Sequence, residues 1–307
     1  MKLVVIAGPT GSGKTELAHR LAAESGGEIV NYDSVQLYRG FDVGSAKPTS
    51  EERAAVPHHL YDILDADQEF NAADYARLAR AKAEEIAGRG KVPLFVGGTF
   101  FYLRALLSGL PEMPGRDEEV RARIRGIASK RGGPERLHRW LSKVDPVTAA
   151  RIPHPDRHRV ERALEVWVVS GQPISTWDRP SHESAPDLEP LKIGLTVPRP
   201  QLVERLDARV EAMYRNGLVE ETRALLSRHS RESRPFGAIG YAEAAALVAG
   251  AMDVAAAIAE TKRRTRAYAK RQMTWLRSER NMQWVEATDR ENTFRAALRL
   301  TERFGIE

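Results

Sequence analysis

An eight-residue stretch near the start of the chain, "GPTGSGKT", has the residue types and the spacing of a phosphate-binding loop. It matches the pattern G-x-x-x-x-G-K-[ST] at every fixed position. Its glycines allow a tight turn in which successive N–H groups converge on phosphate oxygens at a helix N-terminus. A lysine then adds positive charge, and a threonine hydroxyl can hold Mg²⁺. We therefore expect a diphosphate site, with the metal on Thr15, made by Gly8, Pro9, Thr10, Gly11, Ser12, Gly13, Lys14 and Thr15.

Two further side chains follow apolar runs that should end beside this loop. Asp33 comes after residues 28–32, and Thr99 follows two glycines after residues 92–96. Ligands of open α/β sheets bind beyond the carboxyl ends of the strands, so Asp33, Thr99 and the loop should open on one crevice. There Asp33 can accept a proton from an incoming nucleophile, and Thr99 can donate a hydrogen bond to a leaving phosphate oxygen. The local alternatives are that Asp33 caps the next turn with Ser34 and that Thr99 caps a helix.

The loop by itself makes ATP the default ligand, but its usual companion motif is missing. ATP hydrolases of this class end a later strand in an acid that supports Mg²⁺ and water. Here residues 92–96 are followed by Gly-Gly-Thr, and Asp62, on a shorter apolar run, would be the substitute acid. The residues therefore leave open which phosphate compound binds.

The elements that must carry these residues alternate between strands and helices. Residues 3–7 form a continuous apolar run, typical of a strand buried on both faces of a parallel sheet, and residues 15–24 have the periodicity of a helix. The other predicted elements are a helix at 71–88 and strands at 28–32, 60–64, 92–96 and 191–197. This alternation predicts an α/β fold: the parallel sheet of a P-loop, nucleoside-triphosphate-hydrolase-like protein, flanked by helices.

The alternation stops near the middle of the chain. Helices without a strand follow, most clearly at 118–127 and 155–169, and then a loop rich in Pro and Ser, "SGQPISTWDRPSHESAPDLEP". We therefore predict a core domain made of residues 1–111 and 191–307, interrupted by an all-helical insertion domain at 112–190.

The 307-residue chain has an ordinary composition for a globular protein, with 42% hydrophobic and 29% charged residues. Its apolar runs are much shorter than the ~18 residues of a membrane span, and the apolar start is too short for a signal peptide. The absence of cysteine excludes disulfides and thiolate metal sites and suits a reducing compartment. We expect a cytoplasmic monomer without membrane contact. The net charge of +5 is modest, so the placement of charge matters more than its total.

Basic residues concentrate near the end of the chain, where residues 261–280 hold 8 Lys or Arg and a single Glu. On a helix, one stripe would carry Arg264, Tyr268, Arg271 and Trp275. Arginines interleaved with aromatic rings suit an RNA backbone and exposed bases, so we expect Arg264 and Arg271 to bind RNA. The alternative is a surface helix with solvated charges and inward-facing aromatics. The segment "HRVER" (158–162) is a second basic cluster, whose alternative is an exposed helix face.

Taken together, the motifs resemble the tRNA dimethylallyltransferases, also called tRNA isopentenyltransferases. They run in that family's order over nearly the whole chain: "GPTGSGKT", "DSVQLYRGFDVGSAKP" (33–48), "PHHLYDI" (57–63), "VGGTFFYLRALLSGL" (96–110), "RHRVERALEV" (157–166), "GYAE" (240–243) and "TRAYAKRQMTWLR" (265–277). "DSVQ", "VGGT" and "AKRQMTW" are specific, because small-molecule kinases that share the loop do not carry them together. One position departs from the family pattern: Ala242 stands where Lys or Arg usually follows "GY".

The resemblance implies a reaction and a role for each matching residue. A dimethylallyl group would move from dimethylallyl diphosphate to the exocyclic amine of the adenosine 3′-adjacent to the anticodon of a tRNA, with Mg²⁺ as cofactor. Asp33 would be the general base, and Thr99 and Lys14 would complete the catalytic set. The insertion domain would contact the anticodon stem-loop. The tRNA-binding residues would be Asp33, Ser34, Val35, Gln36, Thr99, Arg121, His158, Arg159, Val160, Glu161 and Arg162, beside Arg264 and Arg271.

Two other functions stay open at this point. A small-molecule P-loop kinase, with the helical insertion as its lid, would consume ATP and ignore RNA. A non-catalytic RNA-binding module would carry a decayed loop. The intact Lys14, Thr15 and Asp33 weigh against the module, and the basic aromatic stripe and the missing second acidic motif weigh against the kinase.

Overall fold

The computed structural model describes residues 1–177 and 187–306. The chain divides into two compact units. One unit joins Met1–Leu107 to Ala185–Glu307, and the other is the intervening Ser108–Ser184. The chain therefore leaves the first unit once and returns to it. No described helix is long and apolar enough to cross a membrane.

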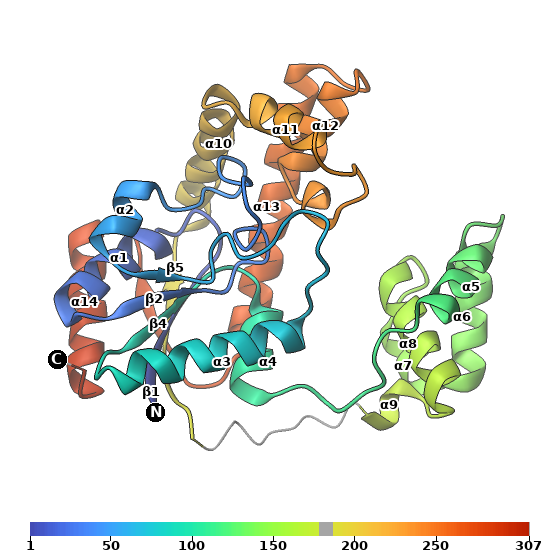
Figure 1. The fold of residues 1–307 in the computed structure, drawn as a ribbon, viewed down its shortest axis with the longest axis horizontal. Helices are drawn as coiled ribbons and strands as arrows, with labels where there is room; N and C mark the ends of the chain where they lie inside the picture. Colours follow the sequence, from blue (N-terminus) through green and yellow to red (C-terminus); the bar gives the residue numbers. More distant parts are fainter. Residues whose placement is uncertain (178–186, 307) are drawn as a thin grey trace. The chain divides into compact units, whose positions relative to one another are not determined.

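A single sheet of six strands, counted over the described residues, lies at the centre of the first unit (Figure 1). The strands are β1 Lys2–Ala7, β2 Glu28–Asn31, β3 His58–His59, β4 Pro93–Val96, β5 Glu189–Thr196 and β6 Met282–Glu286. Their order is β3-β2-β4-β1-β5-β6, and every neighbouring pair is parallel. Parallel neighbours need crossover connections, which helices supply. The predicted α/β class is confirmed.

Both faces of the sheet are buried. Helices α1 (Lys14–Ser25) and α14 (Arg290–Arg303) pack together, and their side chains share one core cluster with Val4, Ile6, Ile29, Leu94 and Ile193 of the strands. Alternate residues of a strand point to opposite faces, so Val5 and Phe95 belong to the other face, where α3 (Ala72–Gly88) contacts β2 and β4. Burial on both sides is why these strands are continuous apolar runs in the sequence.

The remaining helices of the first unit are α2 Ser50–Ala55, α4 Phe100–Ser108, α10 Arg199–Arg215, α11 Leu218–Leu226, α12 Tyr241–Val248 and α13 Val254–Ser278, with a 3₁₀ turn at Arg234–Gly237. The 25-residue α13 contacts both α10 and α12. Asp253 caps its start by accepting a hydrogen bond from the Ala256 N–H. This helix carries the basic aromatic stripe of the sequence.

The predicted strands differ from the observed ones in two places. The strand expected at 60–64 is wrong: β3 covers only His58–His59, and a single isolated bridge joins Tyr38 to Leu64. Leu60 and Asp62 adopt φ of 61° and 54°, which turns the backbone out of the extended region. The strand β6 was missed, because it forms an edge of the sheet and only Val285 among its five residues is buried.

The second unit is built from helices over its described part. These helices are α5 Glu118–Ala128, α6 Gly133–Val144, α7 Pro146–Arg151, α8 Arg157–Ser170 and α9 Ile174–Trp177. Apolar side chains of α5, α6 and α8, among them Ile124, Leu137, Leu141 and Leu164, form its core. The short α9 lies within the stretch predicted as a loop, and residues 178–186 of that stretch lie outside the described residues.

Candidate active site

The phosphate-binding loop lies between the end of β1 and the start of α1. Gly11 and Gly13 adopt φ of 77° and 86°, in the left-handed region that favours glycine. Gly13 is the N-cap of α1, so the first N–H groups of that helix face the loop. The Oγ of Ser12 is buried and has no hydrogen-bond partner within the described chain. The loop therefore has the backbone shape and the spare polar capacity of an anion site.

Lys14 begins α1 at the same place. Its Nζ donates to the Pro9 carbonyl at 2.9 Å, so the side chain folds back over the loop. Burial lowers the pKa of Lys14 to about 7; the Arg209 guanidinium adds to this shift, and the Asp33 carboxylate opposes it. Near neutral pH the Lys14 amine can therefore gain a proton when an anion arrives.

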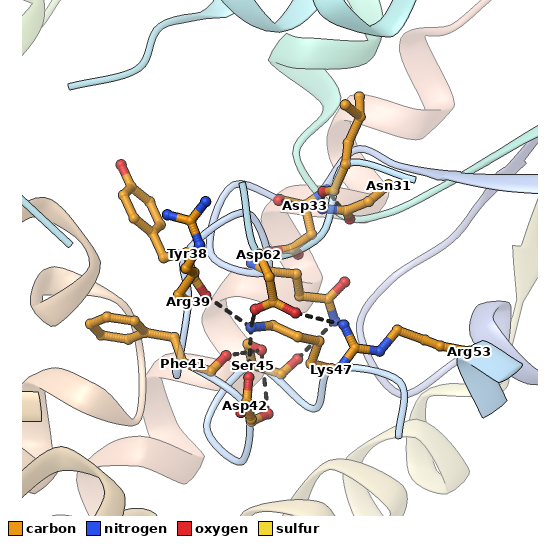
Figure 2. Close-up of polar contacts among 12 residues, drawn as sticks. Asn31, Asp33, Tyr38, Arg39, Phe41, Asp42, Ser45, Lys47, Arg53 and Asp62 are labelled. Atoms are coloured by element: carbon orange, nitrogen blue, oxygen red, sulfur yellow. Dashed lines mark hydrogen bonds and ion pairs between the residues drawn. The ribbon is translucent and has the colours of Figure 1, made fainter. Parts of the chain in front are cut away.

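Asp33 follows β2 and is held in place by Asn31 (Figure 2). Its backbone N–H donates to Asn31 Oδ1 at 2.8 Å, and its carbonyl accepts from Asn31 Nδ2 at 3.1 Å. Asp33 Oδ1 accepts a hydrogen bond from the Val35 N–H at 2.9 Å, so the alternative of turn capping holds for this oxygen. The residue nevertheless lines two cavities. One carboxylate therefore shapes the local turn and also faces the site.

The described lining of the two cavities does not include Thr99. Its hydroxyl accepts from the Ser34 N–H at 2.9 Å and donates to Ser34 Oγ at 3.1 Å. This contact joins the loop after β4 to the loop after β2. Thr99 therefore positions Ser34 and, through the chain, its neighbour Asp33, and the helix-capping alternative is not what its side chain does.

The larger cavity, of about 700 Å³, opens over the phosphate-binding loop. Its lining includes Thr10–Glu16 of the loop and α1, together with Asp33, Gln36, Gly98, Arg209, Tyr268 and Gln272. In a second cavity, of about 390 Å³, apolar side chains make up a larger share of the lining; among them are Val35, Tyr38, Val210, Met213 and Ile239, beside Ser34, Thr265 and Arg271. The two share a wall made of Thr10, Asp33, Ser45, Arg209 and Tyr268. Asp33 thus stands where the cavity over the loop meets the second cavity.

Gln272 of α13 is a site residue that the sequence analysis missed. Its Oε1 accepts from the Thr10 N–H at 2.8 Å, and its Nε2 donates to the Gly98 carbonyl at 3.1 Å. The Tyr268 hydroxyl donates to the same carbonyl at 3.0 Å. A Cβ at Gly98 would lie 2.8 Å from Gln272 Nε2 and 3.3 Å from Asp33 Oδ2. The sequence signal that could have identified Gln272 was its position inside the specific motif "AKRQMTW".

Arg209 of α10 is the second missed residue. It lines both cavities, and its pKa is lowered by burial, an effect that the Asp33 carboxylate opposes. In the larger cavity Arg209 and Lys14 therefore place two basic groups near the Asp33 carboxylate. The sequence carried no motif around Arg209, so only the packing of α10 and α13 reveals it.

The basic aromatic stripe of α13 is divided between two roles. Arg264 pairs with the buried Glu243 of α12, and Trp275 stacks on Phe100 at 4.7 Å between ring centroids. Arg271 is exposed, lies over the Tyr268 ring and lines the second cavity. The alternative of inward-facing aromatics therefore holds for Trp275. Arg264 is engaged by Glu243, and Arg271 keeps the surface position expected of an RNA contact.

In the second unit, two predicted RNA contacts converge on one buried carboxylate. Glu165 of α8 is 1% exposed; it accepts from Arg121 Nε at 2.7 Å and from Arg162 at 2.8 Å. Burial opposes ionisation of Glu165, but the hydrogen bonds from Arg121 and Arg162 outweigh it and lower its pKa. Arg121 of α5 therefore helps to hold that helix against α8, and Arg162, on α8 like Glu165, donates to the Pro114 carbonyl in the segment before α5 at 2.7 Å.

The other residues of the "HRVER" segment differ in exposure. Val160 is 1% exposed and packs in the core of its unit, so its side chain does not lie on the surface where an RNA contact was expected. Glu161 accepts from Arg157, one helical turn earlier. His158 and Arg159 are exposed on α8. Successive residues of a helix point to different sides, so Val160 faces inward while His158 and Arg159 face outward. The sequence analysis treated the whole segment as one cluster and did not make this distinction.

Asp62, the substitute acid considered for an ATPase motif, is engaged elsewhere. Its carboxylate accepts from Lys47 at 2.6 Å and from Arg53 at 2.5 Å. Burial opposes its ionisation, but these two bonds prevail and its pKa is lowered. On α13, Lys262 and Arg263 pair with Glu211 and Glu260.

The described residues fit a metal ion that takes most of its ligands from a bound phosphate compound and water. Within residues 1–177 and 187–306, no three His, Asp or Glu side chains gather where they could hold a metal ion. Thr15 and Asp33 line the same cavity as the loop. Mg²⁺ in phosphate sites commonly takes one or two protein oxygens and completes its shell with phosphate oxygens and water. A metal at Thr15 would therefore need oxygens of a bound phosphate compound beside the threonine hydroxyl.

Comparison with known proteins identifies the family. A model described as IPP transferase matches residues 36–279, and one described as isopentenyl transferase matches residues 1–62. The chain belongs to the IPP transferase family. The family's tRNA dimethylallyltransferases include one from Myxococcus xanthus, 49% identical over 278 residues, which cover 90% of both chains. Another, from Geobacter sulfurreducens, is 46% identical over 286 residues, 93% of this chain and 92% of the relative.

Solved structures of the family agree with this fold. A tRNA isopentenylpyrophosphate transferase from Bacillus halodurans superposes with a TM-score of 0.73 at 36% identity, covering 99% of this chain and 98% of its own. A eukaryotic dimethylallyltransferase described as acting on tRNA gives a TM-score of 0.81 at 28% identity, over 99% of this chain and 79% of its own. The resemblance read from the motifs is thereby confirmed, and the P-loop fold with it.

Proposed function

We propose that this protein transfers a dimethylallyl group from dimethylallyl diphosphate to the exocyclic amine of the adenosine 3′-adjacent to the anticodon of tRNA, releasing diphosphate. The observation that carries the proposal is the shared wall of the two cavities, where Asp33 lies between the phosphate-binding loop and a more apolar compartment. The names of the relatives, tRNA dimethylallyltransferases, support the same reaction. A kinase would need a second acid for Mg²⁺, and Asp62 is committed to Lys47 and Arg53.

The chemistry explains why the diphosphate needs such a cradle. An adenine amine is a poor nucleophile, because its lone pair is delocalised into the ring. The allylic C–O bond to diphosphate must therefore break early, while positive charge is shared across the double bond. The loop N–H groups, Lys14 and Arg209 would stabilise the negative charge that grows on the leaving diphosphate. Mg²⁺ on the Thr15 hydroxyl would supply further Lewis-acid stabilisation of the leaving oxygens.

Asp33 would complete the transfer by removing a proton from the attacking amine. As the C–N bond forms, the amine nitrogen becomes cationic and must lose one proton, which the Asp33 carboxylate accepts. The reaction is then balanced: a C–O bond is exchanged for a C–N bond, the diphosphate leaves with the electron pair, and the proton moves to Asp33. Asn31 and the Thr99–Ser34 contact hold this carboxylate in place.

The adenosine must leave its stack to reach Asp33, because a base that stays stacked keeps the reacting amine inside the anticodon loop. We assign the second cavity to the flipped base, with Ser34, Val35 and the exposed Arg271 in its lining and Gln36 in the lining of the adjoining larger cavity. His158 and Arg159, exposed on α8, would contact the tRNA from the second unit, which we propose is a tRNA-binding domain. We further propose that the protein acts as a monomer in the cytoplasm.

The direct test incubates the protein with Mg²⁺, dimethylallyl diphosphate and unmodified tRNA, followed by mass spectrometry of the nucleosides. The expected product is an adenosine heavier by one five-carbon prenyl unit, with one diphosphate released for each transfer. A tRNA pool that includes adenosine at the target position and gains no prenyl unit refutes the proposal. A rate of ATP consumption that does not depend on RNA and does depend on a small acceptor molecule would point instead to a kinase.

A further inference from the structure

The loop Asp42–Lys47 forms part of the wall between the two cavities. Ser45, Ala46 and Lys47 line the larger cavity, and Gly44 and Ser45 line the smaller one. A loop in this position has little regular structure of its own, and its backbone groups must be satisfied by partners from elsewhere. The identity of those partners shows what keeps the wall in place.

Glu221 of α11 binds three consecutive backbone N–H groups at the start of this loop. Its Oε2 accepts from Asp42 at 3.2 Å and from Val43 at 2.9 Å, and its Oε1 accepts from Gly44 at 3.5 Å. Successive N–H groups that converge on one carboxylate form an anion-binding concavity, here filled by the protein's own side chain. The contact links segments that are 177 to 179 residues apart in the chain.

Tyr241 of α12 completes the arrangement. Its hydroxyl donates to Glu221 Oε1 at 2.6 Å and accepts from the Gly44 N–H at 3.0 Å. The ring is fully buried and packs edge-on against Phe41 at 4.9 Å between centroids. A Cβ at Gly44 would lie 2.5 Å from the Tyr241 ring, so the loop and the ring are in close contact.

The other end of the loop is fixed by Lys47. Its side chain is 1% exposed, and Figure 2 shows its Nζ among oxygens of Tyr38, Asp42 and Asp62. The distances are 2.8 Å to the Tyr38 carbonyl and 2.6 Å to each carboxylate. Gln36 Nε2 donates to the carbonyls of Ser45 and Ala46 at 3.1 and 3.2 Å. The Lys47 end is therefore held by its own segment and by Arg209 of α10, which donates to the Ser45 carbonyl at 3.5 Å, whereas α11 and α12 hold the Asp42–Gly44 end.

We infer that Glu221 and Tyr241 are positioning residues, a latch by which α11 and α12 hold the Asp42–Gly44 end of the loop and so keep Ser45 at the wall between the two cavities. Neither residue is part of the described lining of these cavities, so both act through the loop. The inference rests on the proposed function, because that function assigns the two cavities to the diphosphate and the base. It also gives the "GYAE" segment a structural role in the core unit.

The test compares Tyr241→Phe and Glu221→Gln with wild type by hydrogen exchange and steady-state kinetics. Tyr241→Phe keeps the ring and its packing but removes the hydroxyl shared by Glu221 and Gly44. We expect amide exchange of residues 42–44 to accelerate by about fivefold, the population change that corresponds to one net hydrogen bond. We expect KM for dimethylallyl diphosphate or tRNA to rise more than kcat falls, because binding must first restore the loop.

The control is Tyr102→Phe, which removes a hydroxyl from another buried tyrosine of the same unit. It should leave exchange at 42–44 and both kinetic constants unchanged. The double variant Tyr241→Phe/Glu221→Gln should lose less than the sum of the single losses, because Tyr241→Phe removes the bond between these two side chains and Glu221→Gln weakens the same bond by replacing the carboxylate with a neutral amide oxygen. If Tyr241→Phe does not fold, Glu221→Gln carries the same comparison.

Exchange at 42–44 equal to wild type in a folded variant overturns the latch, and so does faster exchange with unchanged kinetic constants. A wild-type protein that transfers no prenyl group refutes the proposed function. In that case faster exchange at 42–44, together with weaker binding of inorganic diphosphate, still supports the latch, and unchanged exchange or binding overturns it.

Discussion

The lowered pKa of Lys14 leads to a measurable prediction about the pH dependence of diphosphate binding. Its pKa of about 7 in the free protein follows from burial and from the Arg209 charge, which together outweigh the attraction of Asp33. A diphosphate favours the charged ammonium, so its arrival raises this pKa again. At pH 7 about half of the molecules must take up a proton on Lys14 before or during binding.

The sign and the size of the effect follow from this shift. The charged amine is present below pH 7 and is lost as pH rises, so the affinity for diphosphate should fall with rising pH. The loss approaches about tenfold for each pH unit above 7 and reaches roughly fifteenfold between pH 7 and pH 8.5, or about 1.6 kcal/mol. Over the same interval proton uptake on binding should rise from about half a proton to nearly one.

Isothermal titration of dimethylallyl diphosphate measures both quantities. Titrations at one pH in two buffers with different ionisation enthalpies report the protons taken up, and repeating them from pH 6.5 to 8.5 reports the affinity. Lys14→Arg is the matched control, because a guanidinium keeps its charge over this range. Any pH dependence in that variant comes from the ligand, the metal or other groups, and the difference from wild type isolates Lys14.

Equal proton uptake by wild type and Lys14→Arg at every pH would refute this reasoning. Such a result would mean that the Lys14 amine is already charged in the free protein. The attraction of Asp33 would then outweigh burial and the Arg209 charge, and the electrostatic account of the shared wall would have to be revised.

Three further predictions concern the shared wall and the second unit. Asp33→Asn keeps an oxygen that can accept from Val35 but cannot take the amine proton; single-turnover transfer should slow by about 10²–10⁴-fold with tRNA binding retained, and near-normal turnover would reject Asp33 as the base. Gly98→Ala places a methyl group 2.8 Å from Gln272 Nε2 and should lower kcat/KM at least about tenfold through a 1 Å-scale displacement; unchanged kcat/KM would show that the wall tolerates it. Glu165→Ala leaves Arg121 without its Glu165 partner and should destabilise the second unit by about 2–3 kcal/mol in urea unfolding, whereas a loss below 0.5 kcal/mol, roughly that of a surface change, would contradict the structural role.

Local patterns were sufficient for the parts of this protein whose conformation depends on near neighbours. The phosphate-binding loop could be recognised because its glycines, its lysine and the helix that follows lie within a few residues of one another. The strand β1 and the helix α3 were predictable because burial on both faces and helical periodicity leave direct marks on the sequence. The strand predicted at 60–64 failed because a turn with left-handed residues at Leu60 and Asp62 replaces the extended backbone there.

The sequence by itself therefore determined the class of fold, the place and backbone type of the glycine-rich loop and, through the order of its motifs, the family. Only the tertiary structure decided which residues meet in the site. Gln272 reaches Thr10 across 262 residues, and Arg209 joins Lys14 at the wall of the cavities through the packing of α10. It also decided that Val160 is core and that Arg264 is paired with Glu243. These assignments depend on which face of a helix meets a distant partner, and no spacing within one segment contains that information.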